Sequence, residues 1–513
     1  MSLAPGLARY TAMNSRKQRY LNTYGGRYRK KNQAARRKAE IQILSEIAEI
    51  YWKKGNADPK INWSDMLKAH ALYNSCALRS SGAAAVAFEE QALLVQNRYR
   101  WGYRTMSLHE MISLRDKHKA RISEIRMCTR NDMRHLRLRI RRSKSMQNSV
   151  SRLSCSIKDA VTSCNESMLN FARMIIEDAV NVVGTPPCFF TAAAKGSLAR
   201  GEATPYSDLE FFFIIETKTA ETKEYFMSLA MNIYFLIGNM QETKLKYMNI
   251  SELDWFEDLE MSGVKIDGLQ RGAGNIPTGN GVTQRKNKYI TSPDEFVKKF
   301  EIIYNEPNPE DALRGDDSAM LAFTREIYSN SRNLLPGIVR QQQAIPMTEH
   351  RRQLTKEMLE QDVEDYQLDE ATFVEDGVVE VKQKIYRYPS LIILDLSILY
   401  ELHASSSWDA LELLSSQHRI SYSFKTALYN LLALASYIRM CTYLNHNSQT
   451  EYMTLRQAKR QRPCYFPSSK IVNYIIIYMK SMVNHILPVS SLQSDLHLRL
   501  EEGLQAAARL RTQ

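Results

Sequence analysis

The sequence predicts an α+β protein in which a small sheet is flanked by an N-terminal helical region and a C-terminal helical bundle. Two long segments, Leu108–Arg142 and Ser154–Val183, repeat apolar residues at helical spacing. Two short apolar runs, Cys188–Ala193 and Phe211–Ile215, lie on either side of a Gly-Ser turn and are typical of strands. Three Leu- and Ala-rich blocks with short polar joints follow, which favours an antiparallel bundle. These blocks are Leu391–Leu402, Ser407–Leu414 and Ser421–Leu444.

The same patterns divide the chain into four predicted regions. Residues 1–35 form a basic, glycine-containing arm that we expect to be flexible, and residues 36–150 form the helical N-terminal region. Residues 151–385 form the core with inserted helices, and residues 386–513 form the bundle. The further helices expected are 34–53, Trp63–Arg79, Ala83–Gln96, Glu221–Met240, one capped by Thr291 or Ser292, Asp311–Arg332 and 347–370, and the further strand is Val378–Ile385.

Composition favours an intracellular protein that binds an acidic molecule. The formal net charge is +13, and basic residues crowd the first 145 positions, a balance that suits nucleic acid, a membrane surface or a nucleoside triphosphate. No apolar run approaches the roughly 18 residues of a membrane span, and no secretory signal is visible. The seven cysteines are an odd number without a CxxC pair, which indicates reduced thiols and a cytoplasmic location.

Two carboxylates open the second predicted strand. Asp208 and Glu210 are two residues apart, so on a strand they project from the same side, with Leu209 on the other. Carboxylates this close repel each other, and a divalent cation is the usual remedy. Mg²⁺ (or Mn²⁺) commonly takes one or two such ligands together with substrate phosphates. Upstream, Gly196 and Ser197 offer backbone N–H groups and a hydroxyl to the same phosphates. The alternative is a plain turn that leads into a buried strand.

The residues around these carboxylates resemble a known signature. The chain carries GSLARGE at residues 196–202 and SDLE at residues 207–210. This string is similar to the signature of the nucleotidyltransferase superfamily, and more narrowly to its GlnD-type branch, which is related to the uridylyltransferase of the PII signalling protein. Glu210 stands where the superfamily more often has Asp. The likeness covers about Phe171–Leu444 and implies a small mixed sheet as the nucleotidyltransferase core.

A third carboxylate is expected on a neighbouring strand, because two-metal phosphoryl chemistry needs ligands on both sides of the α-phosphate. The best candidate is Asp267, which lies in a short apolar segment bounded by Gly263 and Gly268. The alternative is a turn aspartate before a glycine. The glycine-rich loop Gly272–Gly281 that follows is a candidate to close over a nucleotide.

The resemblance implies a role for each of these residues. Asp208, Glu210 and Asp267 would be catalytic and would hold the metal, with Asp267 also serving as general base. Gly196 and Ser197 would cradle the phosphates of a nucleoside triphosphate. The remaining nucleotide contacts are expected at Arg200, Lys195 and Ser207.

Some of these residues also have ordinary structural interpretations. Arg200 and Glu202 can form a surface ion pair that contributes little, and a lysine such as Lys195 before a glycine turn is more often solvated. The resemblance further implies a substrate-binding helical domain, whose characteristic residues would be Lys382, Arg387, Pro389 and Arg439.

The function that follows is Mg-dependent transfer of a nucleoside monophosphate to a hydroxyl acceptor. By resemblance the acceptor is a protein or regulatory partner that receives UMP or AMP. One alternative is nucleotide addition to RNA, held by the basic N-terminal region, or synthesis of a small nucleotide product. Another is a non-catalytic scaffold that keeps the fold. No His-Asp dipeptide occurs among the ten histidines, so a phosphohydrolase domain that would remove the nucleotide is not expected.

Overall fold

The computed structural model describes residues 29–59, 62–99, 106–142, 146–242, 244–245, 259–260, 290–298, 322–343, 345, 348–365 and 378–454. The chain divides into two compact units, each of which is discontinuous in sequence. Unit 1 comprises Met1–Arg121, Arg173–Cys188 and Thr217–Ile290, and unit 2 comprises Ile122–Ala172, Phe189–Glu216 and Thr291–Gln513. The four-region division of the sequence stays a prediction.

Two long helices, α5 (Leu108–Arg142) and α6 (Met146–Val183), each contribute residues to both units. Both were expected from their apolar spacing, and the buried positions follow it. In the unit 2 part of α5 these positions recur every three or four residues, which is the stripe of an amphipathic helix. They are Ile122, Ile125, Thr129, Met133, Leu136 and Ile140.

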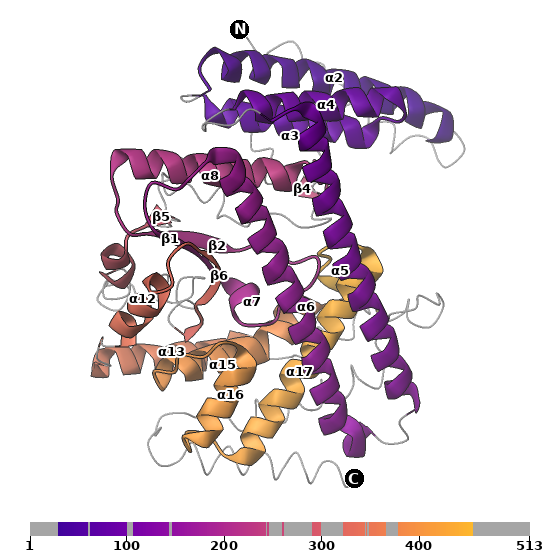
Figure 1. Cartoon of the computed structure of the whole chain (residues 1–513). Helices are drawn as coiled ribbons and strands as arrows, with labels where there is room; N and C mark the ends of the chain where they lie inside the picture. Colours follow the sequence, from indigo (N-terminus) through magenta and orange to yellow (C-terminus); the bar gives the residue numbers. More distant parts are fainter. Residues whose placement is uncertain are drawn as a thin grey trace. The chain divides into compact units, whose positions relative to one another are not determined.

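The described part of unit 1 contains four further helices. Three of them, α2 (Arg29–Ala57), α3 (Trp63–Arg79) and α4 (Ala83–Arg98), pack side by side in sequence order (Figure 1). The fourth, α8 (Ala220–Gly238), starts at Thr219, whose hydroxyl accepts a hydrogen bond from the Thr222 N–H in a reciprocal capping box. The two short strands β3 (Lys244–Leu245) and β4 (Leu259–Glu260) pair antiparallel.

A buried polar network joins three of these helices. His70 on α3 is fully buried, and its Nε2 lies 2.8 Å from Oδ1 of Asn239, which caps α8. The Asn239 amide nitrogen donates to Gln96 on α4 at 2.6 Å. Buried polar groups cost free energy unless they are hydrogen-bonded, so this network fixes one mutual arrangement of the three helices.

A small four-stranded sheet forms the centre of unit 2. Its order is β5 (Ile290–Thr291), β2 (Phe211–Ile215), β1 (Phe190–Ala194) and β6 (Arg325–Ser329). Strand β1 pairs antiparallel with both β2 and β6, and every residue of β1 and β2 is buried. A mostly helical chain with a mixed four-stranded sheet confirms the predicted α+β class.

The prediction for Asp311–Arg332 was wrong where the structure describes it. Residues 325–329 form strand β6, in which only Ile327 is fully buried and its neighbours are partly exposed. A five-residue run with one buried apolar residue fits a helix or a strand equally well, so its spacing could not decide between them. The predicted helix start at Thr291–Ser292 is confirmed, because the Ser292 hydroxyl accepts from the Glu295 N–H at 3.2 Å.

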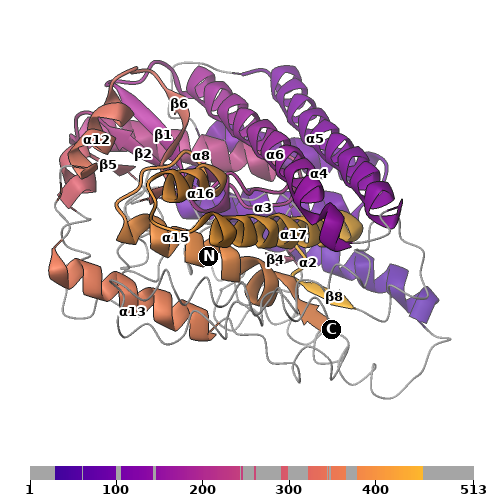
Figure 2. The same ribbon diagram turned by 90° about the horizontal axis from the view of Figure 1, so that it is seen from below.

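The C-terminal part of unit 2 contains the three predicted helices, α15 (Arg387–Leu399), α16 (Ser407–Ser416) and α17 (Tyr422–His446), which contact one another (Figure 2). Helix α13 (Glu349–Asp365) packs on α15, and α12 (Leu334–Gln343) precedes it. The expected strand Val378–Ile385 is only partly correct. Strand β7 (Val378–Glu380), which pairs with β8 (Tyr452–Thr454), gives way to a π-helical turn, Val381–Tyr386, that runs directly into α15.

Two sequence expectations concern the molecule as a whole. Across the described ranges, no helix is both long enough and apolar enough to span a membrane. The six cysteines within those ranges are all free thiols.

Candidate active site

The Gly-Ser turn connects β1 with the short helix α7 (Gly196–Ala199) and lies against the start of β2. The backbone N–H of Lys195 donates to the carbonyl of Glu210 at 2.8 Å, which extends the β1–β2 ladder by one step. Gly196 has a φ of +56°, a conformation that favours glycine. A Cβ at Gly196 would stand 1.3 Å from Oε2 of Glu210. The carboxylate of Glu210 therefore lies directly against the Gly196 backbone, and only glycine leaves room for it.

The two carboxylates precede the buried part of β2. Leu209 and Phe211 are buried, whereas Asp208 and Glu210 each keep part of their surface exposed. This alternation is that of a strand, with the carboxylates on one side. Ser197 is also partly exposed at the turn. The structure thus brings Gly196 into contact with Glu210 and leaves Asp208 on the same edge.

Two of the expected nucleotide contacts lie inside the protein. Lys195 is only 4% exposed, so the solvated alternative for this lysine is wrong. Ser207 is buried, and its hydroxyl accepts from the Thr204 N–H at 2.9 Å and from Nη2 of Arg439 at 3.3 Å. In this structure the Ser207 hydroxyl therefore holds the loop before β2.

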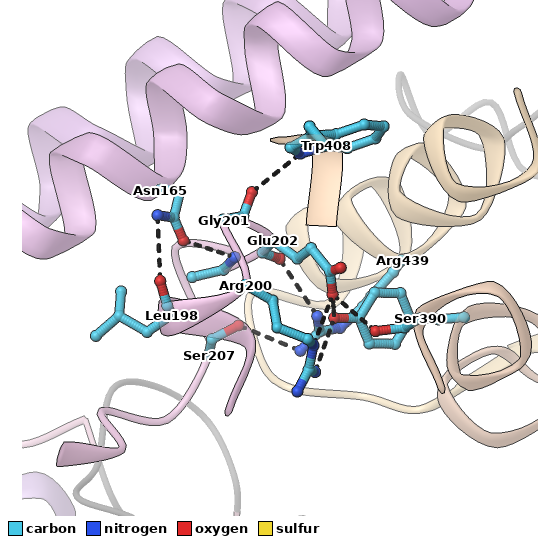
Figure 3. A network of polar contacts seen from close by, with 11 residues as sticks. Asn165, Leu198, Arg200, Gly201, Glu202, Ser207, Ser390, Trp408 and Arg439 are labelled. Carbon is cyan, nitrogen blue, oxygen red and sulfur yellow. Dashed lines mark hydrogen bonds and ion pairs between the residues drawn. The ribbon is translucent and has the colours of Figure 1, made fainter. Parts of the chain in front are cut away.

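Glu202 is buried and Arg200 is only partly exposed, so the surface ion pair expected for them is wrong. Glu202 is 1% exposed, and its Oε2 accepts from Arg200 Nε at 3.2 Å (Figure 3). Two hydroxyls from the C-terminal part of the chain donate to the same oxygen, that of Tyr386 and that of Ser390 at 3.0 Å. We call Arg200, Glu202, Tyr386, Ser390 and Arg439 the Glu202 cluster.

Arg439 completes the Glu202 cluster from helix α17. Its guanidinium carbon lies 4.2 Å from the ring centroid of Tyr386, a cation–π geometry, and its Nη1 donates to the Glu202 carbonyl at 3.4 Å. In the sequence, Arg439 was indicated by family resemblance alone. Tyr386 and Ser390 carried no sequence signal, because their link to Glu202 spans 184 and 188 positions of the chain.

Further contacts fix the loop between α7 and β2. Oδ1 of Asn165 on α6 accepts from the Ala203 N–H at 3.0 Å, and Nε1 of Trp408 on α16 donates to the Gly201 carbonyl at 3.4 Å (Figure 3). Gly201 has a φ of +78°, and a Cβ there would stand 2.9 Å from Cβ of Ser406. The signature string therefore has two physical parts. One part borders the carboxylates, and the other anchors the loop to α6, α15, α16 and α17.

The donor set at the edge fits a magnesium ion as far as the structure describes it. Asp208 and Glu210 are two partly exposed residues with carboxylate side chains, and Mg²⁺ in phosphate-binding sites commonly takes one or two carboxylates. The described ranges hold no group of three His, Cys, Asp or Glu side chains able to bind a metal. The predicted third ligand, Asp267, and the loop Gly272–Gly281 lie outside those ranges.

A comparison with known families points to the same segment. The family described as "Putative nucleotidyltransferase DUF294" matches residues 141–237, which include the entire string from Gly196 to Glu210. These residues resemble a nucleotidyltransferase domain. The match ends before Asp267 and before the C-terminal residues of the Glu202 cluster. No curated protein matches the chain.

Proposed function

We propose that this protein is a magnesium-dependent nucleotidyltransferase of the GlnD-type branch, which moves a nucleoside monophosphate from a nucleoside triphosphate to a hydroxyl on a protein. The observation that carries the proposal is the contact between Glu210 and Gly196. It joins a carboxylate pair to the turn whose sequence matches the nucleotidyltransferase family, at an edge that keeps exposed surface. A cytoplasmic location belongs to the same proposal.

The residues present allow the roles to be assigned. Asp208 and Glu210 would hold the cation, which on binding supplies charge neutralisation for the phosphates and activation of the acceptor hydroxyl. Gly196 and Ser197 would orient the phosphates through backbone N–H groups and a hydroxyl. Arg200 carries a fixed positive charge. Burial acts to lower the pKa of its guanidinium, but Tyr386, Glu202 and Glu210 raise it above its ordinary value.

The reaction is an in-line displacement. The acceptor oxygen forms a bond with the α-phosphorus, the bond to the β-phosphate oxygen breaks, and pyrophosphate leaves. The hydroxyl proton passes to a carboxylate, for which the sequence predicts Asp267. Negative charge grows on the leaving pyrophosphate, and Arg200 is the side chain we assign to it because a guanidinium donates two parallel hydrogen bonds.

A survey with labelled nucleotides tests the proposal. The purified protein is incubated with each labelled NTP, Mg²⁺ and a lysate as acceptor pool, and the products are separated by gel and thin-layer chromatography. Asp208→Ala and Glu210→Ala should abolish transfer. Glu216→Ala is the matched control, because it removes an exposed carboxylate just after the other end of β2. Labelled protein supports the proposal, whereas no product together with no calorimetric binding of Mg–NTP refutes it in favour of a scaffold.

Nucleotide addition to RNA is the second candidate, and one observation favours it. The last turns of α5 expose several arginines within unit 2, the same unit that holds the carboxylate edge. They are Arg134, Arg139 and Arg142. Each phosphate that such side chains neutralise adds salt-dependent affinity. In the survey above, labelled RNA instead of labelled protein identifies this function, and a free dinucleotide identifies a small-molecule product.

A further inference from the structure

Only one of the two carboxylate oxygens of Glu202 has hydrogen-bond partners among the described residues. Its Oε2 accepts hydrogen bonds from Arg200, Tyr386 and Ser390, whereas Oε1 is buried and, among the described residues, has no hydrogen-bond partner. A buried ion pair contributes little net stability, because desolvation of both charges opposes their attraction. The Glu202 cluster also leaves one carboxylate oxygen without a hydrogen bond, so its contribution to stability is small. The orientation that Glu202 gives to the side chains bonded to it explains the cluster better.

The partner that lies nearest the carboxylate edge is Arg200. Its Nε is held by Glu202 at 3.2 Å and its Nη2 by the Tyr386 hydroxyl at 3.4 Å. Its backbone N–H donates at 3.1 Å to the carbonyl of Gly196, the residue against which Glu210 packs. The Arg200 side chain keeps 14% of its surface exposed, and its guanidinium is oriented by these two contacts.

Tyr386 is held rigidly enough to set this orientation. It is the last residue of the π-helical turn Val381–Tyr386, and such turns often mark functional sites because they rotate a side chain out of the regular helix register. Its ring packs under the guanidinium of Arg439. Burial, and then the charge of Glu202, raises the pKa of the Tyr386 phenol, so the hydroxyl stays protonated and donates.

We propose that Tyr386 is a positioning residue for nucleotidyl transfer, which acts on Arg200 both directly and through Glu202 to aim its guanidinium at the departing pyrophosphate. The inference rests on the proposed function and deepens it. While the acceptor oxygen bonds to the α-phosphorus and the bond to the β-phosphate oxygen breaks, Arg200 donates hydrogen bonds to the negative charge that leaves. Tyr386 itself touches no reacting atom. It lies well C-terminal to the family match at residues 141–237, so the C-terminal helices help to complete the site.

The test compares Tyr386→Phe with Tyr388→Phe in the full chain. Tyr388 is also fully buried, two positions away, and its hydroxyl has no hydrogen-bond partner among the described residues, so its removal controls for loss of a buried phenol. Both variants are also made in an Arg200→Lys background, which keeps the positive charge but cannot form bidentate hydrogen bonds. Labelled ATP, UTP, CTP and GTP with Mg²⁺ serve as substrates, and calorimetry measures Mg–NTP binding.

We expect Tyr386→Phe to lower kcat by about tenfold or more with little change in KM, because it removes the hydroxyl's two hydrogen bonds in a charged network, to Glu202 and from Arg200. Tyr388→Phe should leave kcat unchanged. In the Arg200→Lys background Tyr386→Phe should cost nothing further, whereas a purely structural role would cost the same factor in both backgrounds. Equal activity of the two phenylalanine variants, or additive losses, overturns the inference. A wild-type chain that binds and transfers no nucleotide instead refutes the proposed function, and the inference with it.

Discussion

The contact between Gly196 and Glu210 makes a sharp prediction. In Gly196→Ala, the new Cβ would lie 1.3 Å from Oε2 of Glu210, where ordinary contact begins at 3.4 Å. The carboxylate must therefore move by about 2 Å, the difference between these two distances. A displacement of about 1 Å in a reacting group commonly costs about a hundredfold in rate. Gly196→Ala should thus lower kcat/KM by at least that factor.

The effect of backbone strain at residue 196 must be distinguished from the effect of the displaced Glu210 carboxylate. Gly196 has a φ of +56°, and an alanine there costs about 1–3 kcal/mol of stability through backbone strain alone. Gly82 is the matched control, because its φ is +59° and no atom lies within 4 Å of a Cβ built on it. Gly82→Ala should lose a similar free energy of unfolding in urea and keep its activity.

The assay measures labelled nucleotide transfer and Mg²⁺ dependence for both variants at a temperature where both are folded. The expected result is similar stability and very different activity, with a higher Mg²⁺ requirement for Gly196→Ala because one metal carboxylate is displaced. The reasoning fails if Gly196→Ala transfers nucleotide as well as Gly82→Ala does.

Three further predictions concern buried charges. Glu202→Gln should lower the free energy of unfolding by about 3 kcal/mol, because the arginines beside it lose their counter-charge, and an unchanged urea midpoint would contradict this. Burial lowers the pKa of His70 to about 4, partly offset by its bond to Asn239, so the fold keeps this ring neutral. The contribution of neutral His70 to the free energy of unfolding is therefore fully present above pH 6.5. It falls by about 3 kcal/mol as the pH drops towards 4. Urea titrations of the wild type should show this slope, and a His70→Gln variant that keeps the slope would disprove it. Burial and the neighbouring Asp362 raise the pKa of Asp395 well above 3.8, so Asp395→Asn should raise Tm at pH 8 and progressively less as the pH falls. The same gain at pH 4 would rule this out.

The sequence predicted the long helices α5 and α6 well because each carries an apolar stripe that runs over many turns, whereas the ten-residue helix α12 was not predicted. The same logic failed for Ile327 and Lys382. Ile327 is the lone buried residue of a short strand, and Lys382 lies in a π-helical turn where alternation of Val and charged residues had suggested a strand. Neither segment is long enough for periodicity to decide between helix and strand.

The candidate site was predictable in part. The spacing of Asp208 and Glu210 indicated carboxylates on one side of a strand, and the signature string located the turn. Two features of the site could not be predicted, namely the contact of Glu210 with Gly196 and the burial of Lys195. Both depend on how the loop folds back, and neither gives a local pattern in the sequence. The partners of Glu202 lie more than 180 positions away, and single-sequence spacing carries no information about such pairs.

The interleaving of the two units has a consequence for how the chain is made. Unit 1 draws on segments that end near residue 290, while parts of unit 2 lie between them. As the chain leaves the ribosome at about 5–20 residues per second, α2, α3 and α4 wait for α8 and Asn239 to emerge, and His70 meanwhile lacks its hydrogen bond to Asn239. During synthesis from the N-terminus, neither unit can therefore be completed before part of the other unit has been made. A nascent chain stalled before residue 239 should therefore expose the inner faces of α3 and α4 to chaperones, which makes the timing of synthesis itself part of how this protein reaches its fold.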